Sequence, residues 1–560
     1  MIGGLSENAQ LGTQGARASH GDPGDNVRAP PWDQLMNPLA AQYETRYAEA
    51  EPVPQPAAPS LLDAVLEATG DATPERPARV SAAPVRLDAF LSESDPLEAV
   101  KLWLGDIPGR WRGDVQGSLA RRLNADVARI DELLNSQLNA ILHNPAFQKL
   151  EASWRGLKYL VDSVPEGANV KVRVLNATWK DLVRDQERAI EFDQSQLFRK
   201  VYSDEFGTPG GEPFGMLVGN YDVCHRPFPD HPTDDIAALR GIGGVAAAAF
   251  APFVSGVDPR VLELESFAEL ELPLDFERTI QQLDYVKWRA FREEEDARFV
   301  GLALPRVVYR CPYGDQPSTT HGFDFREDTS APDRSGYLWG NPAFTLAACA
   351  ARAFAETNWL ADVRGARPDA ANGGRVIGLP AIGYGTGAAE TPRSVTDAHL
   401  TDLREKELAD LGFIPLCHTP GAAEAAFYST PSVQKPKTFS EAVPSANARL
   451  SAMLHYILCA SRFAHYLKVI MRDRVGSFTT PGDVEDKLAK WLAGFVVSND
   501  DASQEMKAKY PLREGKVQVR EIEGKPGAYQ CSIFLRPHFQ LDQLSAGIRL
   551  TTQLTTRTTE

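Results

Sequence analysis

The strongest periodic pattern in the chain is a stripe of apolar residues within 118–143. Its members recur at spacings of three and four and are Leu119, Leu123, Val127, Ile130, Leu134, Leu138 and Ile141. An 11-residue repeat of this kind predicts a long amphipathic helix whose stripe stays nearly straight along the axis. Ser118 is a suitable N-cap, and Asn144 with Pro145 predicts the end of the helix. Residues 147–162 continue the pattern and predict a second amphipathic helix.

The middle of the chain mixes strand and helix patterns. Short apolar runs predict buried strands over 214–221 and 298–305, and alternation predicts a half-buried strand over 170–175. Longer amphipathic or apolar patterns predict helices over 234–253, 275–299 and 445–474. Residues 312–336 and 365–396 are rich in Gly, Pro, Asp and Thr, which is typical of surface loops. The mixture predicts an α/β chain.

The C-terminal part changes to the two-residue period of strands. Residues 516–523 and 529–537 alternate around a Lys-Pro-Gly turn, and the last strand places Ile548, Leu550 and Leu554 on one side. Together they predict an antiparallel β-meander. An exposed strand edge templates pairing with other chains, and this last strand lacks the lysines or proline that usually block pairing. The pattern favours an edge occupied by a strand from another subunit, although a strand of the same chain could also fill it.

The N-terminal region differs in composition from the rest. Residues 1–100 contain 12 of the 40 prolines and only 4 of the 49 aromatic residues, so residues 1–59 are predicted to be a disordered arm. Residues 60–70 are the exception and predict a short amphipathic helix with a variant capping box. The residues of this helix assigned to partner binding are Ser60, Leu61, Leu62, Asp63, Val65, Leu66 and Thr69. A short helix on a tether is typically gripped by a groove on another protein, and folding back on its own core is the alternative.

The composition narrows the class of protein. The chain has 560 residues, of which 43% are hydrophobic and 24% charged, and its net charge is −16. This acidic balance argues against a nucleic-acid binder. Six widely spaced cysteines form no CxxC pair and no zinc-ligand spacing, and are interpreted as reduced thiols. The start of the chain lacks a signal-peptide pattern, and the most apolar segment, 450–471, contains Arg462 and Lys468, so no membrane insertion is predicted.

No motif predicts catalysis. Cys417 and His418 are adjacent in sequence, which rarely suits a nucleophile–base pair, and His455 and His465 are interpreted as buried structural residues. The acidic run at 292–296 is interpreted as a solvated helix face. No dinucleotide-binding, P-loop, zinc-protease or hydrolase motif occurs. The sequence therefore predicts no catalytic residue, no cofactor and no metal.

A dozen segments in order over residues 60–554 carry a resemblance to one family. Three of the longest are "ILHNPAFQKLEASWRGLKYLV" (141–161), "YVKWRAFREEEDARFVGLALPRV" (285–307) and "ASQEMKAKYPLREGKVQVREIEGKPG" (502–527). The chain resembles the large contractile-sheath subunit of the bacterial type VI secretion system, the TssC/VipB family, also called ImpC/EvpB. The parts that differ from the family pattern are residues 1–59, 224–235, 314–336 and 366–396.

The resemblance implies an α/β (α+β) sheath-type fold with mixed sheets, long helices and a C-terminal antiparallel β-platform completed by strands from neighbouring subunits. It implies a structural protein and not an enzyme. In this family the large subunit pairs with a small sheath subunit (TssB/VipA), and the pairs stack with other copies around an inner tube of Hcp hexamers on a baseplate. Contraction propels the tube into a target cell. The AAA+ unfoldase ClpV then dismantles the sheath through an N-terminal helix.

The resemblance places this assembly in the bacterial cytoplasm and assigns the unfoldase-binding role to residues 60–69. A tail-sheath protein of a phage-like contractile particle is the alternative. The expected parts are a disordered arm (1–59), the unfoldase-binding helix (60–70), a linker (71–117), a helical segment that pairs with the small subunit (118–200), a central α/β domain (201–444) and a C-terminal helix with the β-meander (445–560).

Two further sets of residues are expected at subunit contacts. The residues expected to pack against the small subunit are Leu123, Val127, Ile130, Leu134 and Leu138. The residues expected in strand exchange and the sheath core are Val517, Val519, Ile533, Leu535, Ile548, Leu550 and Leu554.

Overall fold

The computed structural model divides the chain into two units. The larger unit contains Pro145–Glu560 with the short pieces Met1–Ser6 and Leu133–Asn135, and the smaller contains Glu7–Glu132 and Ser136–Asn144. The residues that the structure describes are 2–3, 85–104, 115–208, 210–314, 323, 325–330, 334–366, 373–384, 391–392, 394–472, 481–499, 502–521 and 529–538. The predicted arm, the helix at 60–70 and the last strand lie outside them, apart from residues 2–3.

Three helices make up the described part of the smaller unit. They are α3 (Val85–Ser92), α4 (Pro96–Leu104) and most of α5 (Val115–Leu142). Phe90 and Trp103 join α3 to α4, with ring centroids 4.9 Å apart, and the Trp103 indole donates to Asp126 on α5 over 3.1 Å. Helix α5 confirms the predicted long helix. It begins at Val115, so the prediction that Ser118 is the N-cap is wrong.

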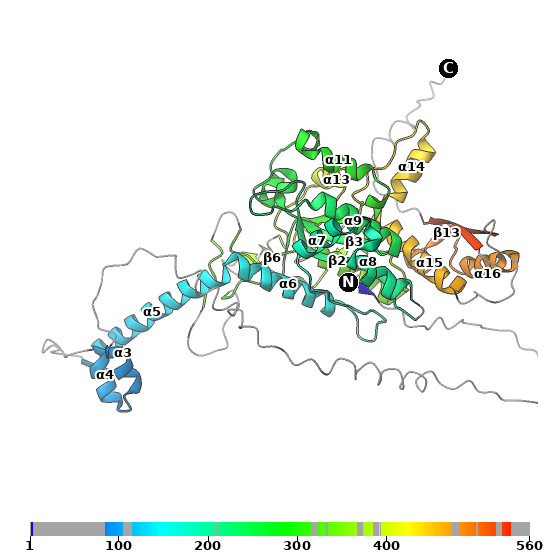
Figure 1. Ribbon diagram of the computed structural model, residues 1–560. Coiled ribbons are helices and arrows are strands. Elements are labelled where there is room, and N and C mark those ends of the chain that lie inside the picture. Colours follow the sequence, from blue (N-terminus) through cyan, green and yellow to red (C-terminus); the bar gives the residue numbers. More distant parts are fainter. Residues whose placement is uncertain are drawn as a thin grey trace, which may run out of the picture. The chain divides into compact units, whose positions relative to one another are not determined.

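The larger unit is built on a five-stranded sheet in the order β1-β2-β3-β4-β10, of which β2 and β3 are labelled in Figure 1. Its strands are β1 (Ile2–Gly3), β2 (Phe214–Val223), β3 (Phe253–Val257), β4 (Val300–Leu304) and β10 (Phe413–Pro415). Strands β2, β3, β4 and β10 run parallel, and β1 pairs antiparallel with β2. Every residue of β3 and β4 is buried, as expected for parallel strands covered on both faces. Strands β2 and β4 confirm the two predicted buried strands.

Helices and shorter strands surround this sheet. The described α-helices of the larger unit are α6 (Pro145–Asp162), α7 (Trp179–Arg188), α8 (Gln196–Phe198), α9 (Asp235–Ala249), α10 (Phe276–Ile280), α11 (Val286–Glu293), α12 (Ala343–Thr357), α13 (Asp402–Asp410), α14 (Ala442–Ser451), α15 (Leu454–Arg472), α16 (Pro481–Ala493) and α17 (Gln504–Lys509). A π-helix, η3 (Arg199–Phe206), and the 3-10 turns η2 (Phe192–Gln194), η4 (Pro259–Leu262), η5 (Phe267–Glu271), η6 (Leu283–Tyr285) and η7 (Asp296–Phe299) join them. The remaining strand pairs are β5 (Val307–Val308) with β6 (Trp339–Gly340), β8 (Gly383–Tyr384) with β9 (Thr391–Pro392), β12 (Ala425–Ala426) with both β7 (Arg375–Val376) and β11 (Cys417–His418), and β13 (Leu512–Glu521) with β14 (Tyr529–Pro537).

The sheet separates two apolar clusters because successive residues of a strand point to opposite faces. Phe253 lies in the cluster that contains the buried side chains of α7, α9 and α11. Its neighbour Val254 lies in the cluster that contains those of α12 and the start of α15. Helix α9 can lie close to its neighbours because it is rich in Ala and Gly. It ends at Ala249, since Phe250 takes a left-handed conformation with φ of 50°.

The single helix predicted over 275–299 is wrong, because the structure breaks this segment into α10, η6, α11 and η7. The guanidinium of Arg289 on α11 donates to the carbonyl oxygens of Ile280 and Gln282. These acceptors at the end of α10 are thereby satisfied without a continuing helix. The amphipathic period is shared by both pieces and could not reveal the turn between them.

The helix predicted over 445–474 is divided into α14 and α15, with residues 452–453 between them. A neighbouring segment supplies the reason. Ser432 donates to the carbonyl oxygen of Ala452 through both its backbone N–H and its hydroxyl, and the N–H of Leu454 donates to Thr430. Backbone groups that would continue the helix are therefore bonded to residues 430–432 instead.

The strand predicted over 170–175 is also wrong, since only Val172 takes part in an isolated bridge. Val170 and Val172 pack partly buried against the apolar cluster on the sheet, and Val174 is exposed. The alternation of exposure therefore stops at Val174, and in the described part of the chain no second strand forms a ladder with this segment.

A membrane span requires a helix that is both long and apolar. Among the described residues, no helix is both long and apolar enough to cross a membrane.

Helix α15 joins the sheet core to the C-terminal part. Its first half contributes Leu454 and Leu458 to the cluster on the sheet, and its second half contributes Phe463 and Leu467 to a third cluster under the C-terminal strands. Helix α15 therefore packs against both apolar clusters.

His465 lies in α15 and is fully buried, as predicted for a structural residue. Its Nε2 atom lies 2.9 Å from the carbonyl oxygen of Ala249 at the end of α9. Burial lowers the pKa of His465 to about 3, and the positive charge of Arg462 adds to the effect.

We expect stability to fall as the pH drops below 6.5, in part because of His465. Its folded-state pKa lies below the ordinary value of 6.5, so its contribution is fully present above pH 6.5 and is lost as the pH falls toward about 3. Between about pH 7.5 and 5.5 the loss from this residue is about 1.4 kcal/mol. His465→Gln retains a donor but does not titrate, so chemical denaturation should show a loss smaller by this amount. Equal losses in both proteins would contradict the assignment.

Candidate assembly interface

The hairpin β13–β14 confirms the two predicted strands of the meander that the structure describes (Figure 1). The strands pair antiparallel from Leu512 opposite Pro537 to Glu521 opposite Tyr529, with one register shift near the start of β13. The turn between them and the last predicted strand, with Ile548, Leu550 and Leu554, lie outside the described residues.

The described residues assigned to strand exchange share one face of the hairpin, and they are Val517, Val519, Ile533 and Leu535. This face packs against α15 and α16, with both valines buried and the other two partly buried. Gly515 lets α16 approach, because a Cβ atom there would lie 2.6 Å from Leu492 Cδ2. The side chains of the assigned residues therefore form a local core, which leaves their backbone groups as the part that a partner strand could use.

The outer edge of β13 is partly covered within the described chain. The N–H of Val519 donates to Glu485 Oε2 on α16 over 2.9 Å. At the start of the strand, the N–H of Leu512 donates to the carbonyl of Phe495, and its own carbonyl accepts from Val497. A side chain and a short backbone segment thus bond to this edge, which is a usual way of preventing unwanted pairing.

The outer edge of β14 is different. Since the N–H of Val519 points to Glu485, Val519 and Cys531 form a non-hydrogen-bonded pair of the ladder. Alternation then directs the backbone N–H and C=O groups of Cys531, Ile533 and Leu535 away from β13. Within the described ranges no group bonds to the backbone of these three residues. The hairpin therefore offers one row of backbone donors and acceptors in the period of a strand.

A second surface lies on α5. The five residues expected to pack against the small subunit are Leu123, Val127, Ile130, Leu134 and Leu138. Leu123 and Leu138 are half-buried, while Val127, Ile130 and Leu134 have exposed fractions of 54%, 42% and 43%. Leu133, which the sequence analysis did not assign, is exposed beside them. An apolar row of this length on one helix exceeds the scattered apolar residues of an ordinary surface.

Helix α6 carries exposed apolar residues that the sequence analysis could not separate from its core face. Leu160 of the predicted stripe is buried, but Trp154 has an exposed fraction of 66%, and Leu150 and Val161 are also exposed. The helical period is the same for both sets. An indole with this exposure is the kind of residue that anchors protein interfaces.

The residues that could suggest catalysis are buried and poorly suited to it. Burial raises the pKa of the Cys417 thiol to about 12, which keeps it protonated at neutral pH. Burial lowers the pKa of the adjacent His418. The thiol of Cys459 is likewise buried, and its pKa is raised to about 12. These groups do not form an activated nucleophile.

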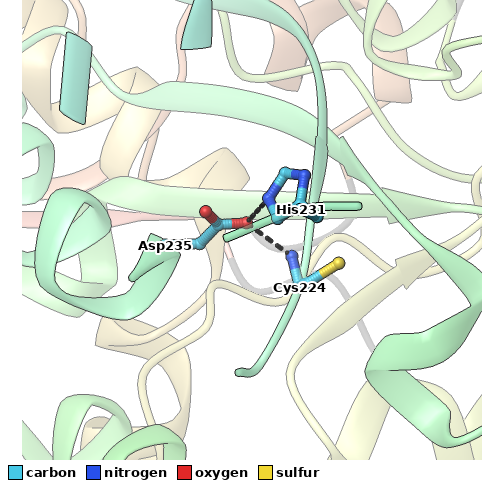
Figure 2. A group of neighbouring side chains, drawn as sticks. All are labelled: Cys224, His231 and Asp235. Carbon is cyan, nitrogen blue, oxygen red and sulfur yellow. Dashed lines mark hydrogen bonds and ion pairs between the residues drawn. The ribbon is translucent and has the colours of Figure 1, made fainter. Parts of the chain in front are cut away.

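One cluster of ligand-type side chains was missed by the sequence analysis. Cys224, His231 and Asp235 bring a thiol, an imidazole and a carboxylate within 4.8 Å of one another (Figure 2). Cys224 follows β2 and Asp235 opens α9, so the end of a strand and the start of a helix meet here. Burial raises the pKa of the Cys224 thiol, and the hydrogen bond to Asp235 raises the pKa of His231. The spacing matches no standard metal motif, so only the strand–loop–helix context could have indicated the cluster.

Comparisons with known proteins agree over most of the chain. The family described as "EvpB/VC_A0108, tail sheath N-terminal domain" matches residues 124–434, and "EvpB/VC_A0108, tail sheath gpW/gp25-like domain" matches residues 443–554. A protein of Pseudomonas aeruginosa, "Type VI secretion system sheath protein TssC1", is 37% identical over 445 residues, which cover 79% of this chain and 87% of that protein. A solved structure, "Cryo-EM structure of the anti-feeding prophage (AFP) baseplate, 6-fold symmetrised", covers 69% of this chain and 84% of that chain at 10% identity and a TM-score of 0.33. That last likeness is too weak to carry a conclusion.

The matches define a tail-sheath protein, and the mixed α/β fold predicted from the sequence is confirmed by the described sheets and helices. The chain belongs to the EvpB/VC_A0108 tail-sheath family, that is, to the TssC/VipB sheath subunits of the type VI secretion system. This family consists of structural sheath proteins, as the resemblance predicted.

Proposed function

We propose that this chain is the large sheath subunit that polymerises with a small sheath subunit (TssB/VipA) and with other copies of itself around an inner Hcp tube, starting from a baseplate. The sheath assembles extended in the bacterial cytoplasm and contracts to propel the tube. The unfoldase ClpV then recycles the contracted form. The chain acts mechanically, without catalytic residues or cofactor.

The open edge of β14 carries this proposal. A strand added beside Cys531, Ile533 and Leu535 continues the hairpin and satisfies backbone groups that no described residue bonds. The last strand of a neighbouring copy, which contains Ile548, Leu550 and Leu554, has the matching two-residue period, and the small subunit is the other source. Because backbone hydrogen bonds bend without breaking, such joints let subunits rotate while they stay linked.

The energy for contraction is then stored in the sheath itself. If extended and contracted interfaces differ by a few kcal/mol per subunit, a value usual for two-state switches, no nucleotide is needed during the stroke. Each subunit contributes little, and the many copies together do the work.

The apolar row on α5 supports the contact with the small subunit. Val127, Ile130 and Leu134 are presented on one helix and remain exposed in the isolated chain. A helix of the small subunit packed along this row would bury them in the manner of two amphipathic helices. Residues 60–69 are proposed to bind the unfoldase.

The edge is tested by Cys531→Pro with Cys531→Ala as its control. Proline removes the outward N–H and blocks the added strand, while the inner ladder of β13 and β14 keeps its hydrogen bonds. We expect both variants to fold, as judged by thermal unfolding. In co-expression with the small subunit, Cys531→Pro should yield at least about tenfold fewer tubules in electron micrographs, since the joint on β14 of every subunit in the lattice loses a hydrogen bond of about 1 kcal/mol. Equal tubule yields from Cys531→Pro and Cys531→Ala would contradict the proposed role of the edge.

The row on α5 is tested by Ile130→Lys, with Ala128→Lys on the other side of the helix as the matched control. A charge within an apolar contact costs a few kcal/mol, so Ile130→Lys should reduce co-purification of the small subunit by at least about tenfold. Ala128→Lys should leave it unchanged. The same yield from both variants would show that the small subunit does not pack on this row.

The unfoldase helix is tested by deleting residues 60–70. Tubules should form normally, because the deleted residues are not part of the proposed joints, whereas addition of ClpV and ATP should no longer release subunits from contracted tubules. A deletion of equal length within 1–59 is the control and should leave release intact. Normal release after loss of 60–70 would assign recognition to another segment.

A further inference from the structure

Cys224, His231 and Asp235 lie in the segment 224–235, one of those that differ from the family pattern. The segment connects the end of β2 at Val223 to the start of α9 at Asp235. Cys224 and Asp235 are buried, and the side chain of His231 has an exposed fraction of 23%, which opens a way in from solvent. Figure 2 shows the carboxylate of Asp235 between the imidazole and the backbone of Cys224.

We propose that Cys224, His231 and Asp235 bind one divalent cation of the zinc class. A thiolate, an imidazole and a carboxylate are ligands that Zn²⁺ accepts in proteins, and a water molecule can take the fourth tetrahedral position. Alkaline-earth cations prefer oxygen ligands, so a sulfur and a nitrogen donor argue against Ca²⁺ and Mg²⁺.

The distances require a small adjustment. Around tetrahedral zinc, with bonds of about 2.0–2.3 Å, ligand atoms lie about 3.3–3.8 Å apart. The three ligand atoms lie within 4.8 Å of one another, so the site closes by about an ångström or less of side-chain movement. The imidazole Nε2 and the carboxylate Oδ2 are joined by a hydrogen bond of 2.7 Å. A neutral imidazole that binds the cation through Nε2 carries its one proton on Nδ1, so an imidazolium loses its Nε2 proton to solvent on binding. The thiol also loses its proton to solvent and binds as the thiolate.

The surroundings hold the carboxylate in place. Oδ1 of Asp235 accepts hydrogen bonds of 2.6 Å from the Trp179 indole and the Thr233 hydroxyl, and Oδ2 accepts one of 2.8 Å from the backbone N–H of Cys224. Groups of this kind around a metal ligand fix its orientation. The Cys224 thiol has no hydrogen bond within the described residues, so coordination breaks no existing contact of the sulfur.

The competing account is that Asp235 only ties β2, the loop and α9 together by hydrogen bonds. Four donors on one buried carboxylate are enough for that role. The two accounts differ in one measurable respect, because only the cation site uses the sulfur of Cys224. If the cation binds, it fastens the divergent loop to the sheet edge of the folded subunit.

The test uses the purified full-length chain, stripped of metal by chelator and titrated with Co²⁺, whose bond to a thiolate gives a charge-transfer absorption in the near ultraviolet. We expect this band to saturate at one equivalent, to disappear on addition of Zn²⁺, and to be absent from Cys224→Ser. The control Cys417→Ser removes another buried thiol and should keep the band. No band in the unmodified chain, or a band that survives in Cys224→Ser, would overturn the proposal.

A second measurement covers the case in which Cys224→Ser folds poorly. One equivalent of Zn²⁺ should raise the unfolding temperature of the unmodified chain and of Cys417→Ser. His231→Gln keeps a hydrogen-bond donor near Asp235 but offers no imidazole, and its unfolding temperature should not respond to Zn²⁺. An equal rise in His231→Gln, or no rise in the unmodified chain, would leave the hydrogen-bond account as the correct one.

Discussion

The structure depends on one constraint, which is that backbone donors and acceptors in a sheet need partners. In the described part of the C-terminal hairpin, the two outer edges meet this need to different degrees. Glu485 and residues 495–497 bond to the outer edge of β13. The outer edge of β14 has no such cover among the described residues. The two edges of this small sheet thus differ in how far the described chain covers them, and the less covered edge of β14 suits a subunit that adds strands from its neighbours.

Helix α15 gives this edge a firm support. Leu454 and Leu458 pack in the cluster on the central sheet, and Phe463 and Leu467 pack under the hairpin. Trp359 belongs to the third cluster, under the hairpin, and stacks on Phe463 with ring centroids 4.1 Å apart. Because closely packed side chains resist deformation, a load applied at the hairpin reaches the central sheet through α15 instead of unfolding the strands locally.

The sequence predicted what depends on local periodicity and missed what depends on contacts between distant segments. The strands β2, β4, β13 and β14 and helix α5 could be predicted because their side-chain periods are regular over enough residues. The breaks at 281–282 and 452–453 could not, since Arg289 and Ser432 take their roles only after folding. The predicted exposed edge was that of the last strand, which lies outside the described residues, so it stays a prediction. The exposure of Trp154 and the meeting of Cys224 with Asp235 depend on how helices and strand ends are placed in three dimensions.

In the assembly proposed above, the local core of the hairpin also sets the character of the joints. Val517, Val519, Ile533 and Leu535 already face α15 and α16 before any partner arrives, so a docking strand gains mainly main-chain hydrogen bonds and little newly covered apolar area. A single joint of this kind is weak and reversible. It accepts many sequences in the added strand, but its main-chain hydrogen bonds fix the register of that strand. The strength of the lattice then comes from the number of joints, because many weak links act together. A wrongly added subunit, which is held by few joints, can dissociate before further subunits are added.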